Sequence, residues 1–155
     1  MNRRNLLAIA PVFVLLGCQK GATPQTRVQT DAALITAGMI AVASAVQASP
    51  KLTAEDKATV TQAVTTLQDA NAAVQKAIVT PGGPAQQIAA AVREVAPIAM
   101  ALLPAGSPEV IALQAALNLV PVFLASAGVA VPAAGAARVA MTAEQARAAL
   151  RGVGK

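Results

Sequence analysis

The sequence predicts an all-α fold: a small, alanine-rich antiparallel bundle of about four main helices followed by a short C-terminal helix. Alanine is the commonest residue of the chain and has the highest helix propensity. Apolar side chains recur at steps of three and four residues, which is the spacing of one helix face. Segments rich in proline and glycine separate these stretches and mark turns. A chain of 155 residues can form one domain with a modest core.

The first element is a leader with the pattern of a secretory signal. Arg3 and Arg4 lie near its start, and residues 6–17 are uncharged and mostly apolar, directly before Cys18. A basic start, an apolar stretch of about 7–15 residues and a small residue before the cut are typical of a signal peptide. The 12 residues of this stretch are too few to cross roughly 30 Å of hydrocarbon as a helix, so a permanent span is not expected.

The leader ends in a motif that resembles the lipobox of bacterial lipoproteins, Leu15-Leu16-Gly17-Cys18. The resemblance implies that a peptidase removes residues 1–17, that the Cys18 thiol receives a diacylglycerol, and that the new amino group is acylated as well. Two or more acyl chains anchor a protein stably, whereas one gives only marginal binding. Gln19 stands where the family's sorting rule would need Asp for retention in the inner membrane, so the resemblance implies the outer membrane, facing the periplasm. An ordinary signal sequence, or a short core helix with an incidental cysteine, is the alternative.

A lipidated tether is predicted over residues 18–27, which are polar and contain glycine and proline, and a bundle domain over residues 28–127. The first helix of this domain is predicted from Val28 to Ala48, and Pro50 ends it. Its apolar stripe comprises Val28, Ile35, Met39, Val42 and Val46.

The second helix is predicted to begin at Thr53, with Glu55 and Asp56 in its first turn, where the helix dipole favours acids. One face forms a heptad seam that includes an asparagine: Val60, Val64, Leu67, Asn71, Val74 and Ile78. Asn71 could fix the register of a bundle or oligomer, or it could lie at a wet edge of the seam.

Prolines punctuate the third and fourth helices. Pro84 suits the first position of the third helix, and Ser107 with Pro108 suits the N-cap and first position of the fourth. Pro97 and Pro121 fall inside these helices, where a proline costs about 3 kcal/mol and kinks the helix. Both helices are therefore predicted to bend.

The hairpin over residues 95–127 has few charges, and its second helix is a marginal transmembrane candidate by hydropathy. Gln114 and Asn118 are four residues apart and give one face of that helix polarity. This polarity favours packing in the core over insertion into lipid.

Residues 128–141 are rich in alanine, glycine and proline and predict a connector, and residues 142–155 predict a short basic helix. Thr142 and Gln145 have the spacing of a capping box. Cations spaced by four residues would share one face of this helix: Arg147, Arg151 and Lys155. This face could contact anionic head groups or cell-wall polymer. Alternatively, the cations stabilise the helix C-terminus through its dipole.

Composition excludes several function classes. The chain has no histidine, which excludes histidine-based triads and general bases and histidine-ligated zinc. Its single cysteine excludes an intramolecular disulfide, and with Phe13 and Phe123 as its only aromatic residues it has no stacking platform for nucleic acid. Its one adjacent pair of carboxylates, Glu55 and Asp56, lies at a helix start. No enzymatic activity, cofactor, metal site or nucleic-acid partner is therefore expected.

The sequence thus predicts a non-enzymatic envelope lipoprotein with a structural or protein-interaction role, whose membrane contact is the lipid on Cys18. An envelope protein or peptidoglycan is the expected partner. In its final Lys155 the chain is similar to Braun's lipoprotein, whose terminal lysine is joined to peptidoglycan, and the similarity implies the same linkage here. One alternative is a membrane-active lipoprotein of lysis or exclusion type, of host or phage origin, whose 95–127 hairpin inserts into the bilayer. Another is a lipid carrier with a cavity in its small-residue core.

Overall fold

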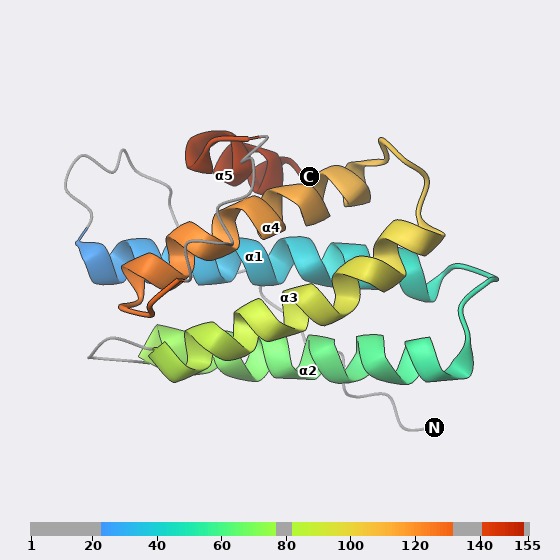
Figure 1. Cartoon of the computed structure of the whole chain (residues 1–155), viewed down its shortest axis with the longest axis horizontal. Helices are drawn as coiled ribbons and strands as arrows, with labels where there is room; N and C mark the ends of the chain where they lie inside the picture. The colour runs from blue at the N-terminus through green and yellow to red at the C-terminus, as the bar shows by residue number, and fades with distance from the viewer. Residues whose placement is uncertain (1–22, 77–81, 132–140, 154–155) are drawn as a thin grey trace, which may run out of the picture.

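The computed structural model describes residues 23–76, 82–131 and 141–153. These ranges contain five α-helices and no strand: α1 (Pro24–Gln47), α2 (Ala54–Lys76), α3 (Gly82–Leu102), α4 (Pro108–Ser126) and α5 (Ala143–Gly152). The helices pack against one another as a bundle, which confirms the predicted all-α fold (Figure 1). The predicted leader, residues 18–22 of the tether and residues 132–140 of the connector lie outside the described ranges.

Helix α1 forms the centre of the bundle. It contacts the other four helices, with α2 and α3 on one side and α4 and α5 on the other (Figure 1). The apolar stripe predicted for this helix is buried throughout. Because helices cover α1 on several sides, further residues outside that stripe are buried as well: Asp31, Ala32, Thr36, Gly38 and Ala43.

Helix α1 begins four residues earlier than predicted, because Thr23 caps it. The Thr23 hydroxyl accepts a hydrogen bond from the backbone N–H of Thr26 at 3.2 Å, and Pro24 occupies the first turn, where a proline is tolerated. The predicted boundary at Val28 is therefore wrong. Residues 24–27, which were expected to belong to the tether, are the first turn of the helix.

The N-caps predicted at Ser107 and Thr142 are both confirmed. Ser107 Oγ accepts a hydrogen bond from the N–H of Val110 at 3.3 Å, with Pro108 following at the first helical position. Thr142 and Gln145 form the reciprocal bonds of a capping box, at 2.8 and 3.2 Å. Helix α3 starts at Gly82, two residues before the predicted first position at Pro84.

The seam predicted along α2 packs into the core at Val60, Leu67 and Val74, all of which are buried. Asn71 is only half-buried, and its side-chain oxygen accepts a hydrogen bond from Gln75 Nε2 at 3.3 Å. Asn71 thus lies at the edge of the seam, which is one of the two positions that the sequence allowed. Ile78, the last seam position, lies outside the described residues.

Both interior prolines are accommodated within continuous helices. Pro97 lies inside α3 and Pro121 inside α4, and neither interrupts its helix. Pro97 is exposed and Pro121 is half-buried. Proline has no N–H, so the carbonyl group four residues before Pro97 lacks its helical donor. Because Pro97 is exposed, this carbonyl lies on the water-accessible side of α3.

The core is built mainly from alanine, valine and leucine, and all five helices contribute to one cluster. Phe123 of α4 is the only aromatic side chain among the described residues, and it is fully buried. The small alanine side chains let the helices approach closely, whereas Phe123 supplies the largest single volume.

Candidate functional site

The residues of the predicted lipobox, Leu15, Leu16, Gly17 and Cys18, lie outside the described ranges, but the domain begins shortly after them. Thr23, the N-cap of α1, comes only five residues after Cys18. Five residues span at most about 18 Å when fully extended. A lipid on Cys18 would therefore hold the start of α1 close to the membrane surface.

The start of α1 and the end of α2 lie together and define one end of the bundle, which we call the tether end. Gln29 Nε2 donates a hydrogen bond to the backbone oxygen of Gln75 at 3.1 Å, and Gln75 Nε2 donates to the backbone oxygen of Gln29 at 2.8 Å. These reciprocal bonds bring the neighbouring cations Arg27 and Lys76 to the same end, and both are exposed.

The start of α3 and the end of α4 complete the tether end. A Cβ atom placed on Gly82 would lie 3.6 Å from Cγ2 of Val129, so the start of α3 lies close to the residues that follow α4. Figure 1 shows the start of α1 (blue) and the end of α4 (orange) at the same side of the molecule. The opposite side, which we call the far end, holds the α1–α2 turn at residues 48–53 and the α3–α4 turn at residues 103–107.

A buried ion pair joins α5 to α1. Arg147 donates from Nε to Asp31 Oδ1 at 2.7 Å and from Nη2 to Asp31 Oδ2 at 2.8 Å, which is a bidentate arrangement. A third bond runs from Arg147 Nη1 to Glu144 Oε1 at 2.6 Å. The side chain of Asp31 is 1% exposed and that of Arg147 is 17% exposed, so Asp31 depends on Arg147 for its counter-charge.

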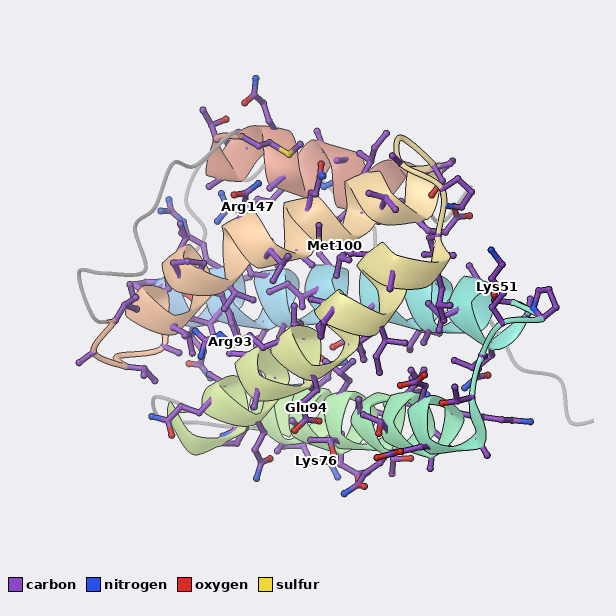
Figure 2. The ribbon with its side chains drawn as sticks, turned by 45° about the vertical axis from the view of Figure 1, so that its right-hand side comes forward. Lys51, Lys76, Arg93, Glu94, Met100 and Arg147 are labelled. Atoms are coloured by element: carbon purple, nitrogen blue, oxygen red, sulfur yellow. The ribbon has the colours of Figure 1, made fainter. Side chains whose placement is uncertain are left out.

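These contacts change the role expected for Arg147. The four-residue spacing predicted an outward basic face shared with Arg151 and Lys155, but the guanidinium of Arg147 is turned toward α1 (Figure 2). Arg151 is exposed, and Lys155 lies outside the described residues. Among the residues that the structure describes, Arg151 alone remains of the three predicted surface cations.

The bond to Asp31 raises the pKa of Arg147 above its ordinary value, burial acts in the opposite direction, and the charges of Asp31 and Glu144 add to the increase. A group whose pKa is raised by folding contributes its full stabilisation at pH values below its pKa in the unfolded state. It loses this stabilisation as the pH rises through its pKa in the folded state. Since arginine is already protonated far above neutrality, Arg147 keeps its charge throughout the acidic and neutral range.

Gly38 lets α5 pack closely on α1. A Cβ atom at this position would collide with Cδ2 of Leu150, which is 3% exposed. The absence of a side chain at Gly38 therefore creates the notch that Leu150 fills. Together with the Asp31–Arg147 pair, this notch sets the position of α5 on the bundle.

Gly38→Val is expected to lower the free energy of unfolding by about 1–3 kcal/mol, the range for overpacking a core. The better helix propensity of valine recovers only a few tenths of a kcal/mol. Gly83→Val is the matched control, because a Cβ atom there meets nothing within 4 Å. Urea denaturation monitored by circular dichroism measures both variants. Equal stability of the two would show that the notch does not constrain α5.

Two of the described helices, α1 and α4, are long and apolar enough to cross a membrane by length and composition alone. Half of the apolar window in each is buried inside the bundle. In α4 the side chains of Leu113, Leu119 and Phe123 are fully buried.

Large apolar side chains are exposed at three described positions, all on α3 and α4: Met100, Ile111 and Val122. Met100 is 58% exposed, and it lies on the face where α3 and α4 meet (Figure 2). No group of three or more histidine, cysteine, aspartate or glutamate residues that could hold a metal ion occurs in the described ranges.

The sequence patterns did not reveal the roles of Asp31, Gly38 or the Gln29–Gln75 pair. Asp31 had a recognisable signal, because it is the only acidic residue between Val28 and Ala48, a segment predicted to be an apolar helix. A charge in that position needs a partner if it is buried. The partner itself could not be identified, since Arg147 is 116 residues away. No family model, curated protein or solved structure matches this chain.

Proposed function

We propose that this chain is a lipid-anchored protein of the bacterial envelope that presents a small helical bundle and acts by structural or protein contact. The observation that carries the proposal is the lipobox-like Leu15-Leu16-Gly17-Cys18, placed only five residues before the capped start of a folded domain. This spacing gives a short tether between the acylated residue and the bundle. Gln19 favours the outer membrane as the destination.

Cys18→Ser is expected to abolish acylation and to leave residues 1–17 attached, because the lipobox cysteine receives the lipid and marks the cut. Metabolic labelling with a fatty-acid analogue and mass spectrometry of the N-terminal peptide measure both effects. The unsubstituted chain should carry label and begin at Cys18.

The matched control adds a cysteine elsewhere in the Cys18→Ser chain, at the exposed Ser126. This second thiol should take no label, because lipidation depends on the motif rather than on any accessible cysteine. Equal labelling of the Cys18→Ser chain and the unsubstituted chain would overturn the proposal.

The second candidate is the membrane-active protein whose 95–127 hairpin inserts, and the apolar character of α4 favours it. Insertion would have to remove Leu113, Leu119 and Phe123 from a core shared with α1 and α5. Dye-loaded vesicles distinguish the two functions, because an inserting hairpin releases the dye and an anchored bundle does not.

A further inference from the structure

We propose that the tether end of the bundle lies directly on an anionic lipid surface, so that the far end points away from the membrane. The inference rests on the proposed lipid anchor at Cys18 and adds an orientation and a contact surface to it. Its occupant is the head-group layer of the membrane that holds the anchor.

The reach of the chain supports this orientation. The five residue steps from the acylated cysteine to Thr23 extend over at most about 18 Å. Helix α1 has 24 residues and is about 36 Å long. The start of α1 is therefore confined to the vicinity of the head groups, whereas the α1–α2 turn at its other end is not.

The charges at the two ends of the bundle favour the same orientation. At the tether end, the terminal turns of α1, α2, α3 and α4 contain two charged residues, Arg27 and Lys76, and no carboxylate. Both cations are exposed, and neither takes part in an ion pair with another described residue. Each cation near an anionic membrane surface strengthens binding about fivefold.

The far end carries the opposite balance, with three carboxylates beside two lysines: Glu55, Asp56, Glu109, Lys51 and Lys57. Asp56 is further held by Thr53, whose hydroxyl donates to Oδ2 at 2.7 Å. Anionic head groups repel such a surface or leave it free. The two turns of the far end are thus the surface that an anchored bundle presents to other envelope components.

A flat orientation on α5 has weaker support from the charges. The carboxylate of Glu144 neutralises part of the charge on α5, and Arg147 is directed inward to Asp31. Arg151 is then the only exposed cation on the described part of this helix. One cation attracts the membrane less than the pair at the tether end.

Spin labels on the lipidated full-length protein test the orientation. Because the only natural cysteine is the proposed lipid site, one added cysteine provides a unique labelling position. The exposed positions are Ser126 at the tether end, Ala105 at the far end and Ala148 on α5. Each protein is placed in phosphatidylcholine vesicles with and without phosphatidylglycerol, and a nickel chelate carried on lipid head groups relaxes nearby labels.

In vesicles containing phosphatidylglycerol, we expect strong relaxation at Ser126 and weak relaxation at Ala105 and Ala148. Arg27→Gln with Lys76→Gln should reduce the ratio of membrane-apposed to free orientations about 25-fold, about fivefold for each cation. The matched control, Lys51→Gln with Lys57→Gln, removes the same charge from the far end and should leave the Ser126 relaxation unchanged. In vesicles of phosphatidylcholine alone, the protein without these substitutions should show the same reduced Ser126 relaxation as the variant with Arg27→Gln and Lys76→Gln.

The possible outcomes distinguish a failure of the proposed orientation from a failure of the proposed lipid anchor. Mass spectrometry first establishes whether Cys18 carries lipid, and an unlipidated protein overturns the proposed function together with the inference. A lipidated protein that relaxes most strongly at Ala105 or Ala148 overturns the orientation alone. The same holds if the two double variants have equal effects.

Discussion

Arg147→Met is expected to lower the free energy of unfolding by about 3 kcal/mol, because it leaves the carboxylate of Asp31 buried without its counter-charge. Asp31 is 1% exposed and receives both of its hydrogen bonds from side-chain donors of Arg147. Removing one partner of a buried pair costs about 3–5 kcal/mol. The lower figure applies because Arg147 is partly exposed, and because α5 can lift away and let water reach Asp31.

Arg151→Met is the matched control, since it removes the same type of side chain from the next turn of the same helix. Arg151 is exposed and is expected to change stability by no more than about 0.5 kcal/mol. Urea denaturation measures the global change, and hydrogen exchange of the α5 amides detects a local release of that helix.

Asp31→Leu combined with Arg147→Met is expected to restore most of the loss. Replacing both members of a buried ion pair with apolar side chains is often neutral or stabilising. If the double variant is as unstable as Arg147→Met alone, the loss comes from side-chain packing and not from the unpaired charge.

Phe123→Ala is expected to cost about 3–5 kcal/mol, the range for removing a fully buried aromatic side chain. Phe123 is 0% exposed, and it is the largest side chain in a core rich in alanine. Helix backbones already in close contact through alanines cannot move further inward to fill the space it leaves. Urea denaturation of Phe123→Ala and of the unsubstituted protein measures the difference in the free energy of unfolding.

Val122→Ala provides the control for Phe123, because it truncates the neighbouring side chain on the exposed side of the same helix. Val122 is 39% exposed, and its truncation should cost less than about 1 kcal/mol. If Phe123→Ala does not fold, Phe123→Leu keeps most of the volume and should still be less stable than Val122→Ala. Equal losses at the two positions would contradict the packing described for α4.

The fold was largely predictable because its signals are local. The stripe of α1 from Val28 to Val46 and the caps at Ser107 and Thr142 depend on residues within a few positions of each other. Such short-range patterns predict where helices begin and which face they bury. The start of α1 was misplaced because polar residues before Val28 indicated a tether, whereas Thr23 and Pro24 form a helix start.

The contacts that hold α5 were not predictable, because they join distant parts of the chain. Periodicity placed Arg147 correctly on a helix with Arg151, but only the packing of α5 on α1 shows which way it points. Gly38 indicated at most that something packs closely against α1, because a glycine inside a helix does not identify the residue that packs against it. The placement of Arg27 and Lys76 at one end of the bundle was unpredictable for the same reason, because it depends on the meeting of two helix ends.

The pairing of Asp31 with Arg147 also bears on the order in which the domain can be completed as the chain is synthesised. The chain emerges from its N-terminal end, so the central helix is present long before residue 147 arrives. Until then Asp31 stays hydrated and one side of α1 stays uncovered. A truncated product that ends before Ala143 would therefore leave that side of α1 exposed, and proteases would cleave it more readily than the finished protein.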